Sequence, residues 1–368
     1  MRISELSFIY DNPLPQLRSR QSAFPFLCAC GDGTLLAAHS IGEAFESVDA
    51  ASHLSRSSDG GRTWSVPKRM FPPQHNGRPV SDYCKVTALA DGRLAALGYA
   101  YYRDDPELPL GNPETGGLLD DFVFWSISED NGETWGPRQE IPCAWGPHAE
   151  ASAPLTVLSD GAWVTPITGF PRWDGTMTGR LYGRLLRSEN QGTTWQDDAV
   201  CMDFGETPVT CYEQRLCQLA SGTMVCIGWN ENTATGARLP NHYTFSTDNG
   251  HSWSAPASTG VTGQASSVCA LGGERLLALH AVRRDTDRPG IYGCIVDFSG
   301  KTWNIVEQGL LWEPDVPMRK DRSMAEIFSF LKFGQPGALL LRDGSVLMSF
   351  WFAQEGQYRT VAARLELE

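Results

Sequence analysis

The sequence of 368 residues lacks several features that would assign it to a common class. No run of about 18 apolar residues occurs, so we expect no transmembrane helix. The first residues, Met1 to Leu6, contain no apolar stretch of the length that a signal peptide needs. Lysine and arginine are also few, because 30 basic residues stand against 43 acidic ones, for a net charge of −13. This charge argues against nucleic acid and membrane surfaces as partners, since both require a basic contact surface.

The ten cysteines show no metal-binding or redox spacing. No two of them form a C-x-x-C pattern, and the nearest two are Cys28 and Cys30. The seven histidines are dispersed as well. We therefore expect reduced cysteines in the core, no metal, no cofactor and a cytoplasmic location, with no particular oligomeric state predicted.

What the sequence does contain is a repeat of eight residues with the pattern S-x-D-x-G-x-T-W. Two copies are complete, and three are modified; they lie at 57–64, 128–135, 188–195, 246–253 and 296–303. The Asp or Asn side chain folds back onto backbone N–H groups, the Gly supplies a positive φ, and the Trp covers the hairpin. We interpret the motif as structural.

A second repeat, an Asp-Gly type turn between apolar runs, alternates with the first and indicates hairpins. Its six copies lie at 32–33, 91–92, 160–161, 221–222, 273–274 and 343–344. Each interval holds about four short strands, which predicts an all-β, six-bladed β-propeller of four-stranded antiparallel blades. We expect residues 1–368 to form one domain. Too few residues follow the sixth turn, so the N-terminal strand 3–10 is predicted to complete the last blade and close the ring.

The eight-residue boxes and the six turns resemble the Asp-boxes, or BNR repeats, of the sialidase (neuraminidase) superfamily. The resemblance implies three arginines that hold a substrate carboxylate, a tyrosine nucleophile activated by a glutamate, and an aspartate acid/base. By spacing from the turns and boxes, Glu213 matches the glutamate and Arg288 matches one arginine, with Arg283 and Arg284 as nearby alternatives. Asp49, with less support, takes the place of the aspartate.

The sequence departs from this family at three other positions. The first arginine corresponds to Ala23, with Arg18 and Arg20 as close substitutes, and the second corresponds to Trp229. Gln335 stands where the resemblance places the tyrosine nucleophile. An amide cannot act as that nucleophile, so the sequence predicts a rebuilt centre without ordinary sialidase activity.

The start of each innermost strand is expected to surround an axial pocket that binds a small ligand. The residues predicted there are Ala23 with Arg20, Tyr83 with Asp82, Glu150 with His148, Glu213 with Tyr212 and Arg215, Gln264, and Gln335. Glu213 and Glu150 are the first acid/base candidates, followed by Asp82 and Asp49. His148 is a candidate proton relay.

Other residues are candidates for substrate binding. Arg288 and Arg103 are suited to hold an acidic sugar, and Trp229 is suited to stack on a sugar ring. Each also has a structural alternative, a loop ion pair for Arg288 and a core position for Trp229. Two long inserts, 102–121 and 312–332, are predicted to form a lid, a pocket rim or an interface.

The leading prediction is a glycoside hydrolase that acts on a small carbohydrate, including one that carries a carboxylate. The first alternative is an oligosaccharide lyase, in which His148 or Tyr212 removes the proton α to a uronate carboxylate. Its product would absorb ultraviolet light. The second alternative is a non-catalytic propeller that binds a carbohydrate or a protein. Such a protein would bind ligand without turnover.

Overall fold

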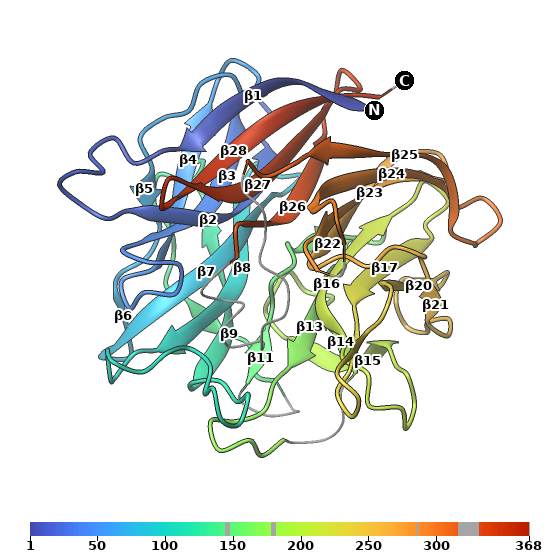
Figure 1. Cartoon of the computed structure of the whole chain (residues 1–368), viewed down its shortest axis with the longest axis horizontal. Helices are drawn as coiled ribbons and strands as arrows, with labels where there is room; N and C mark the ends of the chain where they lie inside the picture. Colours follow the sequence, from blue (N-terminus) through green and yellow to red (C-terminus); the bar gives the residue numbers. More distant parts are fainter. Residues whose placement is uncertain (144–147, 178–181, 285, 316–330, 368) are drawn as a thin grey trace.

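The computed structural model describes residues 1–143, 148–177, 182–284, 286–315 and 331–367. These residues form β-strands, turns and loops, and within these ranges there is no α-helix long and apolar enough to cross a membrane. The strands form six antiparallel four-stranded sheets around a common centre (Figure 1), which confirms the predicted six-bladed propeller.

The blades follow one another along the chain. Blade 1 consists of β2 (Gln21–Ala29), β3 (Leu35–Gly42), β4 (Ala51–Ser57) and β5 (Lys68–Arg69). Blade 2 consists of β7 (Arg78–Ala88), β8 (Leu94–Tyr102), β9 (Asp121–Ser128) and β10 (Gln139–Glu140), with the short β6 (Gln74–His75) beside β7. Blade 3 consists of β11 (Ala149–Glu150) and β12 (Thr156–Val157), followed by β13 (Trp163–Gly169), β14 (Gly183–Ser188) and β15 (Gln196–Met202).

The second half of the chain repeats this arrangement. Blade 4 consists of β16 (Tyr212–Gln218), β17 (Met224–Trp229), β20 (His242–Ser246) and β21 (Ala257–Ser258). A small hairpin of β18 (Glu231–Asn232) and β19 (Ala237–Arg238) extends from it. Blade 5 consists of β22 (Ser266–Gly272), β23 (Arg275–Val282), β24 (Gly290–Asp297) and β25 (Asn304–Trp312). Blade 6 consists of β26 (Phe333–Leu340), β27 (Val346–Gln354), β28 (Gln357–Glu366) and β1 (Arg2–Tyr10).

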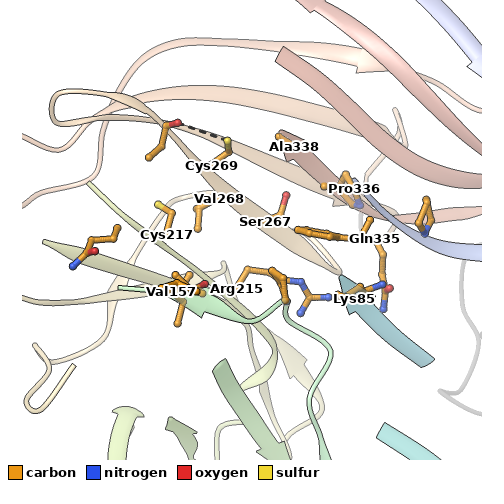
Figure 2. A pocket seen from close by; sticks show the side chains of 18 residues that line it. Lys85, Val157, Arg215, Cys217, Ser267, Val268, Cys269, Gln335, Pro336 and Ala338 are labelled. Atoms are coloured by element: carbon orange, nitrogen blue, oxygen red, sulfur yellow. Dashed lines mark hydrogen bonds between the residues drawn. The ribbon is translucent and has the colours of Figure 1, made fainter. Parts of the chain in front are cut away.

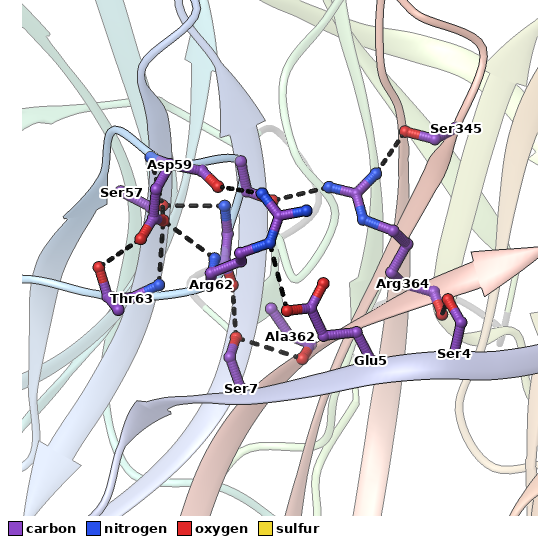
Figure 3. A network of polar contacts seen from close by, with 12 residues as sticks. Ser4, Glu5, Ser7, Ser57, Asp59, Arg62, Thr63, Ser345, Ala362 and Arg364 are labelled. Atoms are coloured by element: carbon purple, nitrogen blue, oxygen red, sulfur yellow. Dashed lines mark hydrogen bonds and ion pairs between the residues drawn. The ribbon is translucent and has the colours of Figure 1, made fainter.

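The N-terminal strand closes the ring. β1 pairs antiparallel with β28, from Arg2 opposite Glu366 to Tyr10 opposite Thr360 (Figure 1). Polar contacts also join it to blade 1, since Glu5 lies 3.3 Å from Arg62 (Figure 3). Both ends of the chain therefore belong to one sheet, which protects the edge of β28 from other strands.

The Asp-boxes are built by local hydrogen bonds. Asp59 accepts from the backbone N–H groups of Arg62 and Thr63, both at 3.0 Å, and from the Thr63 hydroxyl (Figure 3). These bonds hold the pKa of the Asp59 carboxyl below its usual range. In the copy of blade 5 the buried Phe298 replaces the aspartate. Asp297, one residue earlier, accepts from the Ser299 backbone N–H at 2.9 Å, so this turn keeps a carboxylate hydrogen bond from a neighbouring position.

Candidate functional site

Three of the innermost strands carry a bulge at the same place. The pairing register shifts between Ala23 and Phe26 in β2, between Tyr212 and Arg215 in β16, and between Gly334 and Gly337 in β26. The bulged residues have positive φ angles, 58° for Phe24, 45° for Glu213 and 43° for Gln335. A bulge turns its side chain away from the regular alternation and is common next to functional sites. These bulges mark the mouth of the propeller centre.

Glu213 lies at the middle of this mouth, between two neutral donors. The indole Nε1 of Trp229 donates to its Oε2 at 2.8 Å, and the Gln335 amide donates to its Oε1. Blade 6 therefore reaches blade 4 across the axis. The residues at the positions given to the glutamate and the tyrosine nucleophile are in direct contact, with an amide in place of the phenol.

Glu150 is a second carboxyl group at the mouth, on blade 3. Burial and the nearby charge of Glu213 raise its pKa to about 7, although the Ser152 hydroxyl, Arg215 and Lys85 oppose this shift. Two carboxylates that share a site disfavour a second negative charge, so one of them holds a proton near neutral pH.

Lys85 contributes a buried amine to the same cluster. Burial, and then the charge of Arg215, lower its pKa to about 7. Its Nζ donates to the Phe24 carbonyl at 2.7 Å, and Arg215 Nη1 donates to Ser152 Oγ and to the Gln214 carbonyl, both at 2.9 Å. Both cations are therefore oriented by neutral oxygens.

Tyrosines of blade 2 form one wall of the site. Tyr83 and Tyr99 are stacked, with their ring centroids 5.5 Å apart, and Tyr101 packs against Tyr99 edge-on at 5.6 Å. Burial and then the charge of Glu150 raise the pKa of Tyr99 well above its usual value. Tyr83, a predicted substrate-binding residue, is 6% exposed and Tyr101 is 5% exposed, so these rings pack mainly as core beside the cluster.

An axial cavity of about 360 Å³ extends from this cluster along the centre of the propeller (Figure 2). Lys85, Arg215 and Gln335 line it together with residues from the first strands of the other blades. The innermost strands therefore enclose a space that the polar cluster faces.

Several predicted acid/base residues lie outside the cluster. Asp82 is fully buried and pairs with Arg138 at 2.5 Å, and it also accepts from the backbone N–H of Ser52. Asp49 is 43% exposed in its side chain and pairs with Arg20 at 3.0 Å. The Asp82–Arg138 pair is a buried ion pair of the core, and the Asp49–Arg20 pair holds a surface loop.

His148 and Tyr212 occupy neighbouring positions on blades 3 and 4. The Nδ1 atom of His148 lies 3.3 Å from Oδ1 of the buried Asp121, and burial raises the pKa of that carboxyl to about 7. Tyr212 stacks on Phe170 at 5.3 Å and packs against Trp229. Tyr212 thus supports the indole that holds Glu213, whereas His148 belongs to a separate buried pair.

The remaining candidate residues have separate surroundings. Arg288 is 66% exposed in its side chain and pairs with Glu313 at 3.1 Å. Arg103 is buried and donates to the carbonyls of Glu46 and Leu108. Gln264 is 3% exposed, and within the described ranges its side-chain oxygen has no hydrogen-bond partner.

The insert 102–121 packs against blade 3. Asn112 and Thr115 both donate to the Trp173 carbonyl, at 2.9 and 2.8 Å, and Leu118 forms a bridge to Arg172. The insert therefore covers part of the rim between blades 2 and 3. The other insert, 312–332, includes residues 316–330, which lie outside the described ranges.

Sequence reasoning missed Lys85, Tyr99 and Ser152, and it gave Arg283 only as an alternative to Arg288. Arg283 is partly buried, its Nη1 donates to the Phe333 carbonyl at 3.0 Å, and its guanidinium charge lies near Glu213. The alternation of β-strands offered a signal for two of the others, because residues two apart face the same side. Lys85 follows Tyr83 in β7 by two positions, and Ser152 follows Glu150 by two. The same alternation places Asp82 on the opposite face.

Residues 111–313 match the family model of the BNR repeat-like domain. The match covers more than half of the chain, so the chain belongs to the BNR repeat-like family. No curated protein matches this sequence.

Solved structures share the fold at low sequence identity. A protein of unknown function from Dyadobacter fermentans is 20% identical, with a TM-score of 0.75, over 100% of this chain and 99% of that chain. A Hadza microbial sialidase is 15% identical, with a TM-score of 0.65, over 94% of this chain and 66% of that one. Trypanosoma rangeli sialidase in complex with sialic acid is 15% identical, with a TM-score of 0.61, over 99% and 57%. The chain thus spans two thirds or less of the length of these two sialidases and has their propeller fold.

Proposed function

We propose that this protein is a carbohydrate-active enzyme that hydrolyses a small glycoside by acid/base catalysis. Glu150 is the general acid, and Glu213 is the partner carboxylate. The observation that supports this proposal most directly is the raised pKa of Glu150, about 7, beside a second carboxylate. A carboxyl group that keeps its proton near neutral pH can protonate the departing glycosidic oxygen.

Glu213 has a different environment that suits the partner role. It accepts hydrogen bonds from Trp229 and Gln335, which fix its two oxygens toward the mouth. A carboxylate held in this way can stabilise the oxocarbenium-like transition state or activate water. A route through a tyrosine nucleophile does not fit this centre, since Gln335 occupies that position.

The test compares aryl glycosides with good leaving groups and alkyl glycosides with poor ones, including uronides and sialosides. We expect Glu213→Gln to lose turnover on both kinds of substrate. Glu150→Gln should lose more turnover on poor leaving groups, because these need the proton most. Asp130→Asn, in an Asp-box, is the matched control, and the unfolding midpoint of each variant checks its fold.

Three outcomes would contradict the proposal. Equal loss on both kinds of leaving group in Glu150→Gln would remove Glu150 as the acid. An unsaturated product that absorbs ultraviolet light would indicate a lyase. Ligand binding without turnover, unchanged in Glu213→Gln, would indicate a binding propeller.

A further inference from the structure

The axial cavity combines a cationic end with an apolar body. Lys85 and Arg215, with Gln335, form the cationic end, and both charged side chains are more than nine-tenths buried (Figure 2). The wall beyond them is largely apolar and includes Phe26, Leu216, Val157, Val268, Ala270 and Ala338. A volume of about 360 Å³ lies within the range of about 300–1,000 Å³ that is common for small-molecule sites.

The cations have donors to spare. Within the ranges that the structure describes, Nη1 is the only nitrogen of the Arg215 guanidinium that donates to a protein oxygen, and Lys85 Nζ has one acceptor, the Phe24 carbonyl. Neither side chain has a carboxylate within 4.0 Å in the described ranges. The hydroxyl of Ser267, which lines the same cavity and is 7% exposed, also has no partner there. Unused donors thus converge on one space.

The balance of charge favours an anion. Lys85, Arg215 and Arg283 are cations of the cluster, whereas Glu213 and Glu150 are its carboxyl groups. The pKa values of Glu150 and Lys85 are both about 7, so each is about half ionised at neutral pH, and positive charge still exceeds negative charge around the cationic end of the cavity. Buried cations are stabilised by an anion that pairs with them.

The cavity reaches solvent at the end opposite to the glutamates. Val157 lines the cavity, is 41% exposed and directly precedes the hairpin turn at Leu158. Gln218 and Ala270, also in the lining, stand beside the equivalent turns of blades 4 and 5. Glu213, in contrast, lies at the start of β16, at the other end of the same strand. A ligand of the cavity therefore has its own approach, on the face of the hairpin turns.

We propose that the axial cavity binds a small organic carboxylate with an apolar body. Its carboxylate contacts Lys85 Nζ and the free donors of Arg215, beside the Ser267 hydroxyl. Its apolar part lies along Val157 and Val268, toward the hairpin turns. The planar guanidinium is suited to a carboxylate, and the apolar wall distinguishes an organic acid from an inorganic anion. The carboxylate end of this site adjoins the glutamates of the proposed glycoside site, whereas its apolar body lies toward the hairpin turns. Binding is measured directly, so the test does not depend on turnover.

The probes are hexanoate and benzoate, with hexanamide, benzamide and inorganic phosphate as comparisons, and binding is measured by calorimetry on the full chain. We expect a carboxylate to bind at least tenfold more tightly than the amide of the same shape. Phosphate should bind more weakly than either acid. Equal binding of acid and amide, or tighter binding of phosphate, would overturn the proposal.

Variants locate the bound acid. Lys85→Met should raise Kd at least tenfold, and Ser267→Ala should raise it a few-fold, whereas Lys68→Met on the surface leaves it unchanged. Ala270→Phe fills the cavity near the turns without touching the cations. It therefore still tests the site if Lys85→Met fails to fold. Unchanged Kd in Ala270→Phe would show that the acid enters from the glutamate mouth, and would overturn the proposed site.

Proton linkage gives a further readout. The groups whose charges act on Lys85 are Arg215, Cys84, Glu213, Glu150 and His39. The lysine binds an anion best when protonated, and its pKa of about 7 predicts tighter carboxylate binding at pH 6 than at pH 8, by about tenfold. Binding that does not change with pH would exclude Lys85 as the partner of the carboxylate.

Discussion

The Asp-boxes at the periphery and the mouth at the axis are built from the same repeat, yet they differ in how their residues are used. In the box of blade 2, Asp130 accepts from the Thr134 backbone at 2.8 Å, and Asn190 does the same for Thr194 in blade 3. At the axis, equivalent bulges carry Phe24, Glu213 and Gln335. The box repeats one local structure, whereas the axis gives each blade a different chemical group. A repeat fold can therefore keep its frame while its centre diverges.

The largest effect is expected from exchanging a carboxylate for an amide in the two regions. Glu213→Gln should lower kcat/KM by about 10²–10⁴, because an essential acid/base group is lost. Asp130→Asn should retain activity, since Asn190 already serves in another box. Steady-state kinetics and thermal unfolding of both variants check this comparison. Equal activity of the two variants would contradict the claim that catalysis depends on the axial residues and not on the Asp-boxes.

A smaller effect is expected when only the support of Glu213 is removed. Trp229→Phe deletes the indole donor at 2.8 Å and should lower kcat/KM by about 10–100-fold, as expected for a hydrogen bond to a charged group. Trp253→Phe is the matched control, because the Trp253 indole donates to the Gly250 carbonyl in an Asp-box. The pH profile should shift only in Trp229→Phe. A loss of kcat/KM in Trp253→Phe alone would show that the Asp-box, and not the hydrogen bond to Glu213, controls turnover.

The pH dependence of turnover should come from the axis. The pKa of Glu150 is raised to about 7, so the protonated acid is present below that pH and is lost above it. We expect kcat/KM of the wild type to fall as pH rises through about 7, by about tenfold for each further unit. Because the pKa of Glu150 is raised from 4.5 in the unfolded chain to about 7 in the folded protein, the wild type should lose stability as pH rises between these values, and Glu150→Gln should not. A flat profile across this range would argue against Glu150 as the acid.

The smallest effect compares two glycines of the repeated turns. Both Gly192 and Gly161 have φ near +90°, but a Cβ at Gly192 would lie 2.8 Å from Trp125, whereas nothing lies within 4 Å of one at Gly161. Gly192→Ala should therefore cost about 1 kcal/mol more than Gly161→Ala, which carries the backbone penalty alone. Chemical denaturation of both variants measures this difference. An equal cost would show that the Trp125 ring moves aside freely.

Most of the fold could be predicted from the sequence because its signals are local. A box such as 57–64 carries its own hydrogen-bond donors and acceptors, and an Asp-Gly turn needs only a positive φ. The closing strand was predicted at 3–10 and observed at Arg2–Tyr10, because the count of strands left one missing. These features do not depend on which residues meet across the axis.

The site was harder to predict because its contacts join blades that are distant in the sequence. Glu213 and Gln335 are 122 residues apart, and neither residue type indicates the other. Asp82 was a plausible acid by position, but it lies on the face of β7 that turns away from the axis and pairs with Arg138. Lys85, on the axial face, gave no signal beyond its alternation with Tyr83.

The sequence by itself determined the six-bladed frame, since turns, boxes and strand periodicity arise from interactions within a few residues. Only the tertiary structure decided the chemistry of the centre. Ring closure brings six first strands to one axis, where burial and neighbouring charges set the pKa values of Glu150 and Lys85. These pKa values depend on the distances between charges and on exclusion of water, which the order of residues does not contain.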